Sequence, residues 1–174
     1  MPDSDSNYDG PSSTGPGPTA VAMAAFGPSV LRVGRFVVEM VSQARMVLAR
    51  GVTYRVSMYY HAKRNFKVAV FPKSAIAKGT NGKPIEIEVP VRRQDGEVDI
   101  DNAWRELRNT DRAAYDKYYR QTVKDDAGNV VMKNGNPVYY HMHHSHKHGV
   151  MQLIPGDIHG EIGHFGGNRL WNKG

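Results

Sequence analysis

The sequence predicts an α+β fold, and three patterns along its 174 residues support this fold class. Apolar residues recur at helical spacing in 29–50 and again in 101–121. Between them, residues 53–92 contain short β-branched and aromatic runs separated by turn residues. Residues 138–162 have the order strand, loop, strand and short helix. We expect this C-terminal ββα unit to pack on an N-terminal helix and a small antiparallel sheet.

The first twenty residues differ in composition from the rest. Residues 1–20 are rich in Ser, Pro, Gly and Asp and have no apolar periodicity, so we expect a disordered linker or junction. Residues 21–174 would then form a single domain. The start of the chain is polar and acidic, so we expect no secretory signal peptide. The sequence contains no stretch of about 20 apolar residues, so we also expect no membrane-spanning segment.

The N-terminal helix is predicted over 29–50. Ser29 would be its N-cap, valines recur along one face, and Gly51 would end it. The second helical region, 101–121, would turn its apolar side inward through Trp104, Leu107, Ala114, Tyr118 and Tyr119.

Strands are predicted over 53–60, 66–71 and 85–92, and Pro90 places the last near a sheet edge. The Gly- and Asn-rich segments 78–84, 125–129 and 133–137 predict turns, the last two flanking a short hairpin.

Composition limits the chemistry. The chain has no cysteine, which excludes disulfides and cysteine-ligated metal sites. Its formal net charge of +6 favours an anionic partner, of which nucleic acid is the commonest.

Histidine is concentrated near the C-terminus, where seven of the eight histidines lie between positions 141 and 164. Residues 138–144 are predicted to form a strand, so His141 and His143 would face one side and His144 the other. Neighbouring histidines on a strand cannot point to the same spot. One can ligate a metal while the other acts as a base on substrate.

The return strand is predicted over 150–154, followed by a short helix with Asp157 as its N-cap and Gly166 and Gly167 at its end. His143 on the first strand and His159 on the helix could then converge on one ion.

Four elements occur in order and at characteristic spacing. They are His143–His144, Gly-x-Met-Gln-Leu-Ile-Pro at 149–155, Ile158–His159, and His164-x-Gly-Gly. Together they resemble the HNH superfamily of ββα-metal nucleases, with the motif over 137–167. The likeness is closest to the WHH, LHH and SHH toxin domains of bacterial polymorphic toxin systems, and more distant to the DNase colicins and pyocins. It covers about 30 residues, and residues 50–140 carry no motif of the family.

The resemblance implies a site with one divalent metal ion (Mg²⁺, Mn²⁺, Ni²⁺ or Zn²⁺) and a histidine base. His144 would activate water, while His143, His159 and His164 would hold the ion. His164 follows His159 by five positions, roughly 140° round a regular helix, so it reaches the ion only if the helix ends near Gly163. Otherwise it would touch phosphate or hold the C-terminal turn.

One position departs from the family pattern. Val150 stands where the family usually has an asparagine, so the contact that orients the base must come from another residue. Around the site, Arg169, His148 and Lys147 are candidate phosphate contacts. His141 and His146 are expected to be solvated or to face phosphate rather than to bind the ion.

The function implied by the resemblance is a metal-dependent endonuclease toxin. It would cleave DNA in a competing bacterial cell, as a secreted or delivered effector acting in the target-cell cytoplasm, and an acidic immunity protein would protect its producer. Two alternatives remain open at this point. One is an RNase toxin that cleaves tRNA on the same scaffold, and the other is a non-catalytic, metal-stabilised nucleic-acid-binding module.

Overall fold

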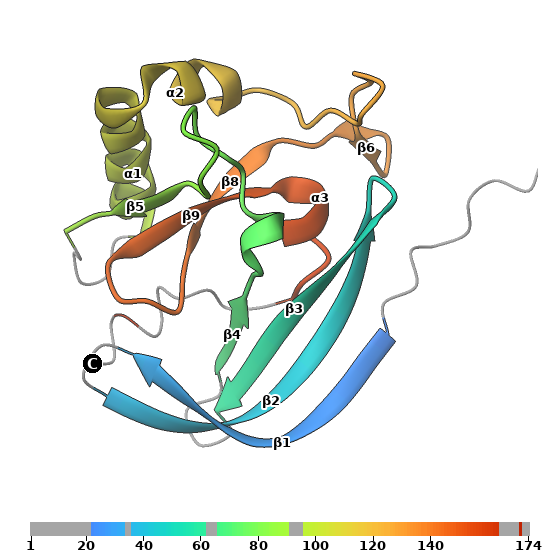
Figure 1. Ribbon diagram of the computed structural model, residues 1–174, viewed down its shortest axis with the longest axis vertical. Helices are drawn as coiled ribbons and strands as arrows, with labels where there is room; N and C mark the ends of the chain where they lie inside the picture. The colour runs from blue at the N-terminus through green and yellow to red at the C-terminus, as the bar shows by residue number, and fades with distance from the viewer. Residues whose placement is uncertain (1–21, 34–35, 62–65, 91–95, 164–170, 172–174) are drawn as a thin grey trace, which may run out of the picture.

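The computed structural model describes residues 22–33, 36–61, 66–90, 96–163 and 171. Its first sheet is antiparallel, has the order β1-β2-β3-β4 and lies along the bottom of Figure 1. The strands are β1 (Ala22–Val33), β2 (Phe36–Ala49), β3 (Val52–His61) and β4 (Phe66–Val70). The strands predicted over 53–60 and 66–71 are therefore confirmed as β3 and β4.

The helix predicted over 29–50 is wrong, because this segment forms the end of β1 and all of β2. Valine is β-branched and fits a pleated strand better than a helix. Gly51 is not a helix cap either. Arg50 and Gly51 both have positive φ, 50° and 75°, and form the two-residue turn between the paired residues Ala49 and Val52. Such a turn, with two positive φ angles, suits the twist of an antiparallel hairpin.

The second sheet is also antiparallel and has the order β5-β9-β8. It consists of β5 (Glu86–Glu88), β9 (Val150–Pro155) and β8 (Tyr140–His144). Of the predicted strand at 85–92, residues 86–88 are thus confirmed, while residues 91 and 92 lie outside the described part of the chain. A short hairpin is present, formed by β6 (Met132–Lys133) and β7 (Asn136–Pro137). Most of it lies within 133–137, which was predicted as a turn.

Helices follow β5 and β9. The region predicted as helix over 101–121 forms α1 (Gly96–Thr110) and α2 (Arg112–Tyr118). The two helices are separated at Asp111, whose carboxylate accepts a hydrogen bond from the Ala114 amide and so caps α2. α3 (Gly156–His159) follows β9 directly, and the 3-10 helix η2 (Lys73–Ala75) follows β4.

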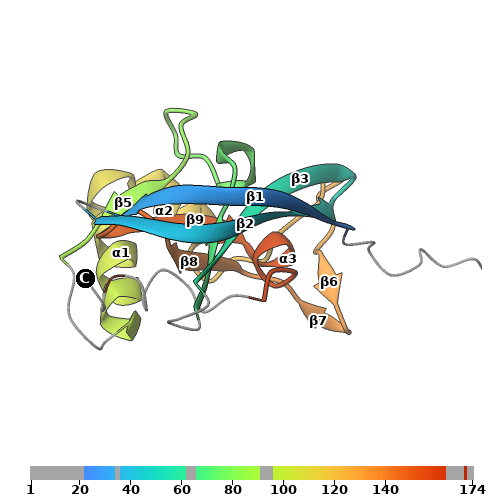
Figure 2. The same cartoon turned by 90° about the horizontal axis from the view of Figure 1, so that it is seen from below.

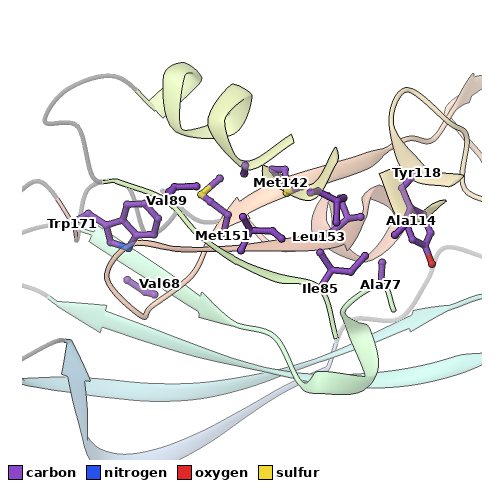
Figure 3. Close-up of a cluster of buried hydrophobic side chains, with 13 residues drawn as sticks. Val68, Ala77, Ile85, Val89, Ala114, Tyr118, Met142, Met151, Leu153 and Trp171 are labelled. Atoms are coloured by element: carbon purple, nitrogen blue, oxygen red, sulfur yellow. The ribbon is translucent and has the colours of Figure 1, made fainter. Parts of the chain in front are cut away.

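The second sheet is the middle layer: α1 and α2 cover one of its faces, and the first sheet lies against the other (Figures 1 and 2). Two apolar clusters hold these layers together. The first cluster joins α1 and α2 to β8 and β9 through Leu107, Tyr118, Met142, Met151 and Leu153 (Figure 3). The second joins β2, β3 and β4 to β9 and α3, and includes Val47, Val56, Ala69, Ile154 and Ile158. The first cluster contains Leu107, Ala114 and Tyr118, as their helical spacing predicted; Trp104 and Tyr119 are partly buried.

The observed fold class is α+β, as predicted, with antiparallel sheets throughout the described residues. Within the same ranges, no helix has the length and apolar character needed to cross a membrane. The C-terminal order of strand, loop, strand and short helix is present as β8, β9 and α3.

Candidate functional site

β8 separates two groups of side chains because alternate residues of a strand face opposite sides. Met142 belongs to the apolar cluster beneath α1 and α2, and His144 contacts Asp99 of α1. His143 instead lies against Phe71, with ring centres 4.9 Å apart, and against His159 of α3. The predicted division of the two neighbouring histidines between opposite faces is therefore observed.

On the α3 side, three imidazoles lie together. The ring centres of His143 and His159 are 5.3 Å apart with their planes at 69°. Those of His141 and His159 are 5.4 Å apart, with planes 19° from parallel. His141 is the most exposed of the three, yet burial of its ring lowers its pKa below the ordinary histidine value. The structure thus adds His141, which the sequence placed apart from the ion, to the vicinity of the two predicted ligands.

The spacing of His143 and His159 fits a shared ion. Two imidazoles bound at about 2.1 Å to one tetrahedral ion hold their ring centres roughly 5 Å apart, close to the 5.3 Å observed. Within the described ranges no set of three His, Asp or Glu side chains is arranged to hold a metal. The described part of the chain therefore supplies two of the predicted ligands. His164, the predicted third, lies outside it.

Local backbone geometry brings α3 close to β8. The Gly156 amide donates to the Tyr139 carbonyl at 2.9 Å. A methyl group at 156 would collide with that same carbonyl oxygen and lie 2.9 Å from two atoms of the His141 ring. Only glycine permits this approach, which places His159, one helical turn later, against the histidines of β8.

An ion pair fixes α3 to the first sheet. Arg50, in the turn between β2 and β3, donates through Nε to Asp157 Oδ2 at 2.8 Å, and the two side chains are 21% and 11% exposed. The prediction of Asp157 as an N-cap is wrong, because the N-cap residue is Pro155 and no side chain caps the helix. The Asp157 carboxylate instead pairs with Arg50 of the first sheet's β2–β3 turn.

On the opposite face, His144 is held between two side chains. Its Nε2 lies 3.3 Å from Oδ2 of the completely buried Asp99, and its ring centre lies 4.7 Å from that of Trp171. Burial lowers the pKa of His144, and the opposing hydrogen bond and charge of Asp99 do not restore it. The neutral imidazole, the form that can accept a proton, is therefore favoured.

Sequence reasoning missed Asp99, although its position carried a signal. Asp99, Ala103 and Leu107 recur every four residues, so the apolar stripe of α1 begins with a carboxylate. An acidic residue on a buried stripe needs a polar partner. Val150 offers no polar side chain at the position where HNH nucleases usually have asparagine, and Asp99 is the carboxylate that contacts the candidate base.

The candidate phosphate contacts have different surroundings. Lys147 pairs with Glu86, with Nζ 3.2 Å from Oε2, and its side chain is 50% exposed. Gln152 donates to the same carboxylate at 2.7 Å. His148 is exposed, with its ring centre 6.0 Å from that of Trp171. Arg169 lies outside the described residues.

Comparison of the chain with protein-family models, curated protein sequences and solved structures returned no significant match. The likeness to HNH nucleases therefore depends on the motif residues.

Proposed function

We propose that this chain is a metal-dependent endonuclease that hydrolyses phosphodiester bonds of DNA, with β8, β9 and α3 as an HNH-like ββα-metal motif. The observation that carries the proposal is the divided histidine pair of β8. His143 faces His159 at a separation that suits a shared ion, while His144 faces a buried carboxylate. Two adjacent histidines with such different partners support two chemical roles.

His143 and His159 would hold the ion, with His164 as the predicted further ligand. A divalent ion there would polarise the phosphate and stabilise the leaving 3′ oxygen. Imidazole nitrogen binds zinc and nickel well, and manganese and magnesium less strongly. Two histidine ligands therefore favour zinc or nickel at this site over manganese or magnesium.

His144 would take the proton from the attacking water. In-line displacement requires the attacking and leaving oxygens to lie on opposite sides of phosphorus. Among the described residues β8 is an edge strand of its sheet, and consecutive Cα atoms are about 3.8 Å apart, so side chains on both of its faces border the same edge. A phosphate at this edge would have the ion's ligands on one side and the base on the other.

Three variants test the division of labour. His144→Ala should lower kcat on plasmid DNA about 100-fold or more, because general bases contribute at least this much, and should leave metal affinity unchanged. His143→Ala and His159→Ala should lose both cleavage and metal binding, measured by calorimetry. The adjacent His143 and His144 substitutions serve as controls for each other, since only one should alter metal binding.

The rival interpretations predict different results. A non-catalytic, metal-stabilised nucleic-acid-binding module would bind DNA without cutting it under any metal. It would also unfold on chelation, which thermal denaturation detects. Cleavage of tRNA but not plasmid by the purified protein would replace the DNase proposal with an RNase on the same scaffold.

The biological setting follows from the same proposal. A DNase of this kind would act as a toxin delivered into the cytoplasm of a competing cell, and its producer would need a protecting partner. The net charge of +6 suits both a polyanionic substrate and an acidic immunity protein. Co-purification from cells that express the chain with its neighbouring gene product would identify such a partner.

A further inference from the structure

Asp99 is an unusual residue for the position it occupies. Its side chain lies in the first turn of α1, is completely buried and has His144 Nε2 as a partner at 3.3 Å. Its second oxygen, Oδ1, is also buried and has no hydrogen-bond partner among the described residues. Burying a carboxylate with one of its two oxygens unpaired is costly, and the positive end of the helix dipole offsets only part of that cost.

The contact determines which ring nitrogen of His144 carries the proton. A carboxylate only accepts hydrogen bonds, so Nε2 must donate to Oδ2. In a neutral imidazole with a proton on Nε2, the lone pair is on Nδ1. The carboxylate therefore leaves Nδ1 as the proton-accepting atom.

A second contact limits rotation of the same ring. Trp171 lies edge-on to His144, with planes at 68°, and its own Nε1 donates to the Ser145 carbonyl at 3.0 Å. Trp171 is 3% exposed and belongs to the apolar cluster beneath the helices. A ring flip of His144 would break the bond to Asp99 and disturb this packed indole.

We propose that Asp99 is the positioning residue of the candidate base: it holds His144 in the tautomer and orientation in which Nδ1 accepts the proton of the attacking water. This inference rests on the proposed nuclease function and adds the residue that makes the histidine competent. Asp99 touches neither substrate nor ion and acts only through His144. The arrangement requires long-range packing, since the two residues are 45 positions apart.

The test compares Asp99→Asn with Glu97→Gln. Both substitutions remove one acidic charge from the first turn of α1 without changing size, but Glu97 is exposed. We expect Asp99→Asn to lower kcat about 100-fold with KM close to unchanged, because its effect is on base competence and not on substrate binding. The Glu97→Gln variant should have the same kcat and KM as the wild type. Thermal denaturation will show that both variants are folded before their rates are compared.

Two further measurements separate positioning from a purely structural role. In the His144→Ala background, Asp99→Asn should cost no additional activity, because the two residues act as one unit. ¹⁵N NMR of the imidazoles should show the Nε2-protonated tautomer in the wild type and its loss in Asp99→Asn. Equal cost of Asp99→Asn with and without His144 would overturn the proposal, as would an Nδ1-protonated ring in the wild type.

The outcomes also separate this inference from the nuclease proposal. If the wild type cleaves no nucleic acid with any divalent metal, the nuclease function fails and the catalytic part of this inference fails with it. The NMR result still decides whether Asp99 sets the His144 tautomer. If the wild type is active and Asp99→Asn has the same kcat, only the positioning role is wrong.

Discussion

Gly156→Ala tests whether the close approach of α3 to β8 depends on the absence of a side chain. In a helix, alanine in place of glycine normally stabilises a protein by about 0.4–1 kcal/mol, mainly through the unfolded state. Here the added methyl would collide with the Tyr139 carbonyl oxygen and lie 2.9 Å from the His141 ring. A backbone carbonyl cannot rotate away, and overpacking of this kind costs about 1–3 kcal/mol.

The collision outweighs the gain, so we expect Gly156→Ala to destabilise the fold by about 1–2 kcal/mol. For a chain of this length that corresponds to a fall in Tm of roughly 2–8 °C. Thermal and urea denaturation followed by circular dichroism will measure it. Metal affinity should fall as well, because relief of the collision moves α3 and His159 away from the histidines of β8.

Gly163→Ala is the matched control. A methyl group there has nothing within 4 Å, so the Gly163→Ala variant should be as stable as the wild type or slightly more stable. If Gly156→Ala is as stable as Gly163→Ala, the close approach of α3 to β8 is not a constraint, and the placement of His159 derived from it is wrong.

Two further substitutions test the packing around each face of β8. Ile158→Ala removes a completely buried side chain between α3 and the first sheet, and should cost about 2–5 kcal/mol by urea denaturation; a cost below 1 kcal/mol would contradict this packing. Trp171→Phe keeps an aromatic ring but loses the Nε1 hydrogen bond to the Ser145 carbonyl, so it should cost about 1 kcal/mol; an unchanged Tm would show that this bond contributes nothing.

Local patterns predicted the C-terminal elements well. Residues 138–144 and 150–154 alternate or run apolar between clear turn residues, and the structure has β8 and β9 in these positions. Period-two alternation also predicted that His143 and His144 face opposite sides. These features depend on backbone geometry within a few residues, which the sequence specifies directly.

The segment 29–50 shows where such reasoning fails. Its valines satisfy helical spacing, but the structure pairs the segment with β3 through contacts such as Ala44 with Ser57 and Val47 with Tyr54. The same Gly51 can end a helix or complete a hairpin turn, because both need a positive φ. The neighbouring strands, which the local pattern does not contain, decided between the two.

The sequence by itself determined that the candidate ligands and bases near the C-terminus are histidines without cysteine, and that two neighbouring histidines face opposite sides of one strand. Only the tertiary structure showed that His159 meets both His143 and His141, and that His144 meets Asp99. Alternation along a strand is a local property of the backbone. The partner that a side chain meets depends on which distant segments pack against that strand, and only burial in the folded core decides this.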